Sequence, residues 1–184
     1  QEGEFEFDDP IQMYLPDFEN QSVLVDSQGT NINQTKARVN DITVQHLITH
    51  TSGLGSRSSS LYRENRVRDK NFTLDQMVSN AAQIPLFQDP GTEFRYGIHA
   101  TILGKLIEVW SGRPLREFLE EELLSKLNMN STMFWAAGDD QDRLAGLYRP
   151  VNGELNSYQI EDVAYTERPR LIEGGVGLLS SVGD

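Results

Sequence analysis

A tyrosine at the junction between a loop and a helix is the residue in this chain best placed for chemistry. Tyr96 follows a turn signal, Pro90-Gly91, and precedes an apolar run with helical spacing. A tyrosine in such a position can face a site and exchange a proton with a reacting group. The competing interpretation is an aromatic side chain that only fills the start of the helix.

The chain lacks the nucleophile that would accompany such a base. None of its serines is followed by a lysine three residues later, and no G-x-S-x-G sequence is present. It has no cysteine, which excludes cysteine nucleophiles, thiolate metal sites and disulfides. Residues 1–184 therefore contain a candidate base without its nucleophile.

Two further patterns are typical of ligand sites but are incomplete here. His46 and His50 are four residues apart on one predicted helix, as in a metal-binding pair, but the glutamate of H-E-x-x-H is missing and no third ligand is indicated. The run Gly174-Gly175-Val176-Gly177 lacks the spacing of nucleotide-binding loops and favours a close backbone approach instead. We expect structural histidines, no metal and no cofactor.

Composition excludes several classes of partner. A net charge of −12 argues against nucleic acid, and the one basic stretch, residues 63–70, is interrupted by acidic residues. No apolar run approaches the roughly 20 residues of a membrane-spanning helix. With 38% hydrophobic residues among 184, the chain can bury a core as one domain or as part of a larger one.

The helix after Tyr96 has clear boundaries. Its apolar residues recur at helical spacing, and Gly112 is expected to end it as the C′ residue. The residues predicted to face inward are Ile98, Ile102, Leu103, Leu106, Ile107 and Trp110.

The other predicted elements are mostly short helices. Thr73 and Gln76 form a capping box that opens a helix over residues 74–83. Asn152-Gly153 is typical of a type I′ turn and predicts a hairpin of residues 143–150 and 154–160. The remaining predictions are a short helix from Pro10 that Pro16 ends, a strand over residues 22–25, a helix over residues 41–50 closed by Gly53 at C′, and a helix over residues 114–127 striped by Leu115, Phe118, Leu119, Leu123 and Leu127.

Several stretches carry a family resemblance. His46-Leu47-Ile48-Thr49-His50-Thr51-Ser52-Gly53-Leu54 is close to a family signature, and it follows Asp8-Asp9-Pro10-Ile11 and Tyr14-Leu15-Pro16-Asp17-Phe18. Matching segments continue in the same order at residues 90–96, 103–104, 111–115, 143–148 and 174–181. These segments resemble the penicillin-binding-protein-like serine hydrolases, the family of class C β-lactamases, family VIII carboxylesterases and D-alanyl-D-alanine carboxypeptidase relatives.

The resemblance implies an α+β fold. We expect part of the β-lactamase/transpeptidase-like fold: mostly its helical region, with a β-hairpin and the edges of the antiparallel-sheet core. Residues 1–184 would be the central part of one serine-hydrolase domain, with about residues 170–184 re-entering the α/β core. The S-x-x-K serine is expected before Gln1, and the K-T-G or H-x-G strand after Asp184.

The resemblance also assigns candidate site residues. Tyr96 aligns with the tyrosine of the family's Y-x-N motif and is the predicted catalytic general base. A phenol has an ordinary pKa of about 10, so such a base needs its anion stabilised, here by the upstream lysine. Gly97, Ile98 and His99 are the predicted substrate-binding residues, although His99 has the alternative role of orienting the helix start.

Two positions depart from the family motif and bear on the substrate. Gly97 replaces serine, and Ile98 replaces the asparagine whose amide recognises an amide of the substrate. Because isoleucine cannot make that hydrogen bond, a buried peptide group would be left unsatisfied at a cost of about 1 to 3 kcal/mol. Esters have one donor fewer and lose less.

We therefore predict a serine-dependent acyl hydrolase of carboxylesterase type that acts on a small-molecule ester or amide through an acyl-enzyme. The alternatives are a β-lactamase, a D-Ala-D-Ala-type peptidase, and a catalytically inactive binding or scaffold relative; acyl transfer is a further reading. The sequence does not indicate an oligomeric state, and a secreted or periplasmic location is slightly favoured over a cytoplasmic one.

Overall fold

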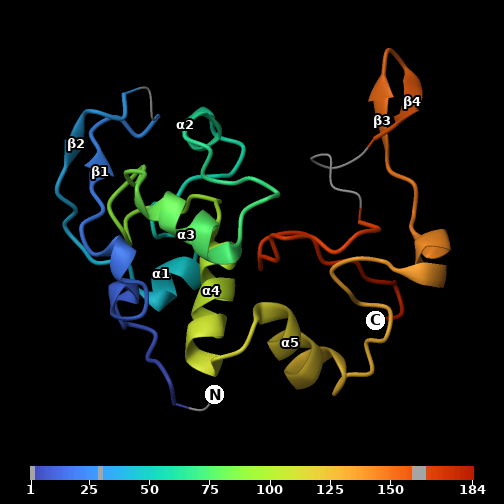
Figure 1. Ribbon diagram of the computed structural model, residues 1–184. Helices are drawn as coiled ribbons and strands as arrows, with labels where there is room; N and C mark the ends of the chain where they lie inside the picture. The colour runs from blue at the N-terminus through green and yellow to red at the C-terminus, as the bar shows by residue number, and fades with distance from the viewer. Residues whose placement is uncertain (1–2, 29–30, 159–164) are drawn as a thin grey trace.

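Helix α4 (His99–Ser111) lies in the middle of the molecule, with the N-terminal elements on one side and the C-terminal ones on the other (Figure 1). This computed structural model describes residues 3–28, 31–158 and 165–184. Ile102 and Leu106 of α4 are fully buried, and Gly112 ends the helix with a φ of 66°. The predicted helix and its glycine C′ residue are thus confirmed.

The N-terminal side of α4 holds most of the hydrophobic core. The α-helices on this side are α1 (Val44–Ile48), α2 (Ser60–Glu64) and α3 (Leu74–Ala82). The strand β1 (Val23–Leu24) pairs antiparallel with β2 (Thr35–Lys36). Thr73 and Gln76 form the predicted capping box at the start of α3. The helix predicted from Pro10 is instead a 3-10 turn, η1 (Ile11–Met13), and Pro16 begins a second one, η2 (Pro16–Phe18).

Helix α1 ends earlier than predicted, and with a different residue. The C′ residue is His50, not Gly53, and it has a φ of 55°. The Thr51 N–H donates to the His46 carbonyl at 2.8 Å and the His50 N–H to the Leu47 carbonyl at 3.3 Å, the two bonds of a Schellman motif. Gly53 also has a positive φ, 84°, but there it allows the close approach of residues 86–88.

The helix predicted over residues 114–127 changes register midway. After α5 (Leu115–Leu119) the backbone continues as one π-helical turn, η3 (Glu120–Leu124). This turn carries an extra residue, so the inward face shifts: Leu124 is buried, whereas Leu123 and Leu127 are 45% and 60% exposed. The apolar stripe predicted for an uninterrupted helix is therefore wrong beyond Leu119.

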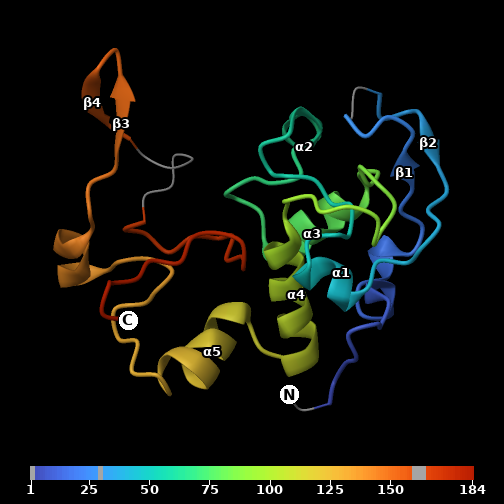
Figure 2. The same ribbon diagram turned by 180° about the vertical axis from the view of Figure 1, so that it is seen from behind.

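The predicted hairpin is present but shorter, and it projects from the molecule (Figure 2). β3 (Tyr148–Val151) pairs with β4 (Glu154–Ser157), and Asn152 and Gly153 both have positive φ, as a type I′ turn requires. Arg143 instead ends a 3-10 helix, η4 (Gly138–Arg143). The last two residues of the predicted second strand, 159–160, lie outside the described residues.

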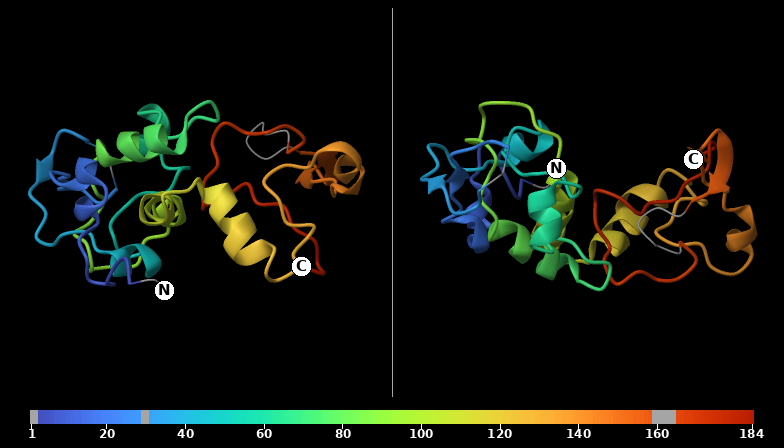
Figure 3. Two further views of the ribbon diagram at one scale, coloured as in Figure 1. Left: turned by 60° about the horizontal axis from the view of Figure 1, so that its bottom comes forward. Right: turned by 90° about the horizontal axis from the view of Figure 1, so that it is seen from above.

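The C-terminal segment returns from the side of α5 to pack against α4 (Figure 3). A Cβ atom at Gly174 would lie 2.3 Å from the Ala100 carbonyl oxygen, so only glycine permits this contact. Beside it, the buried Glu173 carboxylate accepts hydrogen bonds from Thr101 Oγ1 at 2.8 Å and Arg68 Nε at 2.6 Å. The predicted close backbone approach is confirmed for Gly174.

Among the described residues, no helix combines the length and the apolar character needed to cross a membrane.

Candidate active site around Tyr96

The backbone around Tyr96 is held on both sides, while its ring is open. The Arg95 N–H donates to the His50 carbonyl at 2.8 Å, and the Ile98 N–H donates to the Gly55 carbonyl at 3.1 Å. The Tyr96 side chain is 69% exposed. The backbone beside Tyr96 is therefore fixed, and its phenol is accessible.

Gly97 allows this segment to lie against the end of the family-like run 46–54. A Cβ atom at Gly97 would lie 2.5 Å from the Gly55 carbonyl oxygen and 2.7 Å from that of Leu54. Both neighbours are backbone atoms, which cannot move aside as a flexible side chain could. Glycine is thus required here by close packing, and the predicted substrate contact of Gly97 stays a prediction.

Ile98 points into the protein interior. It is 5% exposed and belongs to the hydrophobic core cluster. It occupies the N-cap position of α4, where its side chain makes no capping hydrogen bond. Its part in choosing between esters and amides stays a prediction.

His99 is fully buried at the first position of α4. Its Nδ1 lies 3.0 Å from Nδ1 of His50, and its Nε2 is buried with no hydrogen-bond partner. Burial, and after it the charge of a protonated His50, lowers the pKa of His99 from 6.5 to about 4. His99 is therefore a neutral imidazole at neutral pH.

His50 joins His99 to the aromatic residues on the surface. Its ring is stacked on Tyr96, with centroids 5.3 Å apart and an interplanar angle of 19°, and meets the His99 ring edge-on at 4.5 Å. Phe94, 70% exposed, lies on the same ring at 5.7 Å. Nothing in the local sequence pattern had indicated His50 as part of the site.

His46, the other member of the predicted pair, serves a different purpose. Its Nδ1 accepts a hydrogen bond from the Thr43 N–H at 3.2 Å, which completes the capping box of α1. Burial lowers its pKa. His46 therefore caps α1, whereas His50 contacts Tyr96 and His99. Within the described ranges, no three His, Asp or Glu side chains are grouped to hold a metal ion.

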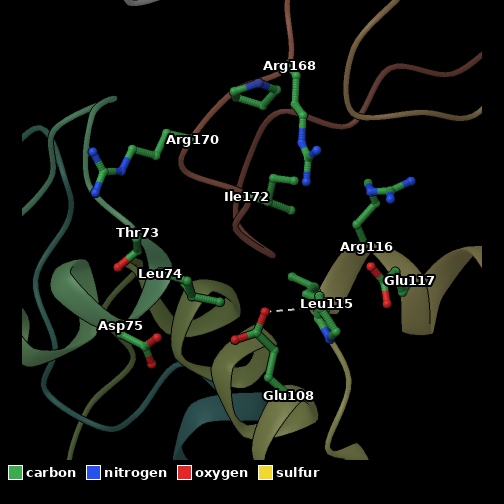
Figure 4. Close-up of a pocket in the computed structure, with 12 residues that line it drawn as sticks. Thr73, Leu74, Asp75, Glu108, Leu115, Arg116, Glu117, Arg168, Arg170 and Ile172 are labelled. Carbon is green, nitrogen blue, oxygen red and sulfur yellow. Dashed lines mark hydrogen bonds between the residues drawn. The ribbon is translucent and has the colours of Figure 1, made fainter.

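A pocket of about 470 Å³ lies elsewhere, between α3, α4, α5 and residues 168–172 (Figure 4). In it, Arg168 points from the C-terminal segment towards Arg116 of α5, and the Glu108 carboxylate accepts a hydrogen bond from the Leu115 N–H at 2.9 Å. Its lining does not include Tyr96 or the three residues after it. The pocket is thus not the site predicted from the sequence.

A family model matches the whole chain, and two relatives match 73% and 72% of it. The family model described as Beta-lactamase matches residues 1–184. Esterase EstB from Burkholderia gladioli is 29% identical over 143 residues, which cover 73% of this chain and 33% of EstB. Acyltransferase mokF from Monascus pilosus is 30% identical over 134 residues, which cover 72% of this chain and 32% of that protein.

A solved structure shows the same fold. EstCE1, described as a hydrolase with promiscuous acyltransferase activity, superposes with a TM-score of 0.80 at 23% identity over 98% of this chain and 50% of its own. The chain spans less than half the length of the curated relatives it matches. Its α+β structure is part of the β-lactamase-like fold, and the chain belongs to the beta-lactamase family, which includes esterases and acyltransferases.

Proposed function

We propose that the intact protein is a serine-dependent acyl hydrolase of carboxylesterase type, with Tyr96 as its general base. Residues 1–184 would be the central part of its domain, and about residues 170–184 would continue into the sheet core. The nucleophilic serine and its lysine would come from an S-x-x-K segment that precedes this chain in sequence. The proposal is supported by the family match and by the esterase EstB among the relatives.

The observation that carries the proposal is the contrast between the Tyr96 backbone and side chain. The backbone is anchored by the hydrogen bonds of Arg95 and Ile98, yet 69% of the side chain is exposed. A tyrosine that only filled the helix start would bury its ring. Here Ile98 and His99 fill that position, which leaves the Tyr96 hydroxyl for another task.

The reaction that follows has two halves. The Tyr96 phenolate, stabilised by the lysine ammonium, accepts the serine proton as the serine oxygen attacks the ester carbonyl. Collapse of the tetrahedral intermediate breaks the ester bond, and the alcohol leaves with that proton. The same phenolate then takes a proton from water as the water oxygen attacks the acyl-enzyme carbonyl. Collapse of this second tetrahedral intermediate breaks the bond to the serine oxygen, which takes the proton back from Tyr96, and the acid is released.

The replacement of the motif's asparagine supports an ester as the substrate. The asparagine of Y-x-N is replaced by Ile98, so the chain offers no amide there to a peptide bond of the substrate. A β-lactam or D-Ala-D-Ala substrate would leave its own amide unsatisfied, whereas an ester would not. Acyl transfer to an alcohol is the second candidate, because the relatives include the acyltransferase mokF.

The test is Tyr96→Phe in the intact protein, assayed on a short-chain aryl ester. We expect kcat to fall by about 10² to 10⁴-fold, while the thermal midpoint barely moves, because the ring is retained. Tyr148→Phe is the matched control, since Tyr148 is also exposed, at 62%, but lies on β3.

Activity of Tyr96→Phe within a few-fold of wild type would refute the catalytic role of Tyr96. A wild-type protein with no activity on esters, β-lactams or peptides, and no labelling by a serine-directed phosphonate, would instead favour the inactive binding or scaffold relative.

A further inference from the structure

His50 holds the segment that carries Tyr96 at both of its ends. Its backbone carbonyl accepts the Arg95 N–H at 2.8 Å, and its side-chain Nδ1 lies 3.0 Å from Nδ1 of His99. Tyr96 lies between these two contacts and stacks on the same imidazole. One residue from the end of α1 thus holds a five-residue segment, residues 95–99, that is 45 or more positions away in sequence.

The contact between the two imidazoles selects their tautomers. A distance of 3.0 Å between two Nδ1 atoms requires one N–H and one lone pair. His99 Nε2 is buried and unpartnered, and an orphaned buried N–H is rarer in proteins than an orphaned acceptor. We therefore assign the proton of His99 to Nδ1, from which it is donated to Nδ1 of His50, and the proton of neutral His50 to Nε2.

The Tyr96 phenol ring stacks on the imidazole of His50, and this contact restrains its orientation. A phenol that is 69% exposed has rotational freedom, and a displacement of about 1 Å at a reacting group can cost about a hundredfold in rate. The orientation of the His50 ring depends in turn on His99, which is fixed by complete burial in the first turn of α4.

We propose that His99 and His50 are positioning residues for Tyr96: His99 donates from Nδ1 to His50, and the imidazole of His50, so held, fixes the phenol by stacking. In this role both histidines act through Tyr96, without needing a contact with the substrate. The inference rests on the proposed function and extends it, because it names the residues that orient the general base Tyr96. It also gives a reason for a histidine at the C′ position of α1, where glycine is the usual residue.

The experiment compares His99→Leu with His99→Asn in the intact protein, because an asparagine amide can replace the Nδ1 donor and leucine cannot. We expect His99→Leu to lower kcat on an aryl ester by about ten- to a hundredfold with KM within about threefold. We expect His99→Asn to stay within about threefold of wild type. His50→Phe keeps an aromatic ring but loses the hydrogen bond, and we expect it to behave like His99→Leu.

His46→Leu is the control for a purely structural effect. His46 makes a comparable contact, 3.2 Å from the Thr43 N–H, but the ring that stacks on Tyr96 is that of His50. We expect it to lower the thermal midpoint and leave kcat per folded molecule unchanged. A loss of kcat in His46→Leu as large as in His99→Leu would overturn the positioning role.

The last comparison separates this inference from the proposed function. In a Tyr96→Phe background, His99→Leu should cause no further loss of kcat, because the hydroxyl that the histidines orient is absent. An equal loss in both backgrounds, or folded His99→Leu and His50→Phe proteins with wild-type kcat, would overturn the inference while leaving Tyr96 as the base. If Tyr96→Phe alone is fully active, the proposed function fails.

Nitrogen-15 NMR of the histidine-labelled protein reads the tautomers without reference to activity. The imidazole signals that disappear in His50→Phe belong to His50, and their chemical shifts should be those of an Nε2–H tautomer. An Nδ1–H tautomer at His50 would contradict the assignment.

Discussion

Gly97 lies directly against the backbone of Gly55, and this contact fixes the path of the chain beside Tyr96. The Gly55 carbonyl oxygen accepts the Ile98 N–H at 3.1 Å, and the same oxygen would be 2.5 Å from a Cβ atom at Gly97. The family motif has a serine at position 97. In this chain the backbone of Gly55 leaves no room there for a Cβ atom, which explains the glycine.

Restoring that serine should destabilise the protein. Because backbone atoms fill the space, we expect Gly97→Ser to lower the free energy of unfolding by about 1 to 3 kcal/mol. Gly183→Ser is the matched control, since a Cβ atom there would meet only Ser181 Oγ, at 3.8 Å. Urea unfolding of the two variants measures the difference, and equal stabilities would contradict the close contact.

Replacing the buried Ile98 with asparagine should lower the stability of the protein. Ile98 is 5% exposed in the core cluster, so Ile98→Asn both removes apolar contacts and buries an amide. We expect a loss of about 3 kcal/mol or more, against about 1 kcal/mol for Ile98→Val. Thermal unfolding tests this, and an Ile98→Asn protein as stable as Ile98→Val would show that the side chain is not buried in the intact protein.

The selectivity prediction concerns folded enzyme only. We expect wild-type protein to have a higher kcat/KM on short-chain aryl esters than on a chromogenic cephalosporin. We expect Ile98→Asn to reduce the ratio of these two values by about tenfold, which corresponds to one hydrogen bond. The measurement is kcat/KM on both substrates. A wild-type preference for the cephalosporin would count against the esterase assignment.

The buried ion pair between Glu173 and Arg68 should make a large contribution to attachment of the C-terminal segment. The two side chains are 3% and 17% exposed, and Glu173→Ala removes the carboxylate that accepts the hydrogen bonds of Arg68 and Thr101. We expect a loss of about 1 to 3 kcal/mol in the free energy of unfolding. Thr101→Ser, which keeps the hydroxyl that donates to Glu173, should cost much less. A Glu173→Ala loss below about 1 kcal/mol would contradict this, as measured by urea unfolding.

Mild acid should destabilise the protein through His99. In the unfolded chain His99 takes up a proton near pH 6.5, whereas in the folded protein it stays neutral down to about pH 4. The unfolded state binds more protons in that window, so the free energy of unfolding falls as the pH falls, by up to about 3 kcal/mol.

The variant His99→Asn isolates this contribution. Its stability should fall less steeply than that of wild type between pH 6.5 and 4, because the contribution of His46 is present in both proteins. Parallel curves would show that His99 is not buried as a neutral group.

Those parts of the fold that rest on neighbouring residues were predictable from the sequence. The capping box of Thr73 and Gln76, the left-handed Gly112 and the Asn152-Gly153 turn each depend on contacts within a few positions. The same holds for the helical face of α4, and for the position of Tyr96 just before it.

The tertiary structure decided what depends on contacts between distant residues. His50 took the C′ position expected for Gly53, and its ring lies between Tyr96 and a buried His99. The π-helical turn after α5 is likewise not visible in local periodicity, because an uninterrupted helix fits the pattern equally well.

The sequence by itself thus determined the main helices, turns and caps, which depend on residues a few positions apart, and its family resemblance implied the α+β class and the role of Tyr96 as candidate base. Only the tertiary structure decided which side chains surround that base. The His50–His99 contact joins residues 49 positions apart, and the gain from burying them together exists only once α1 and α4 are packed.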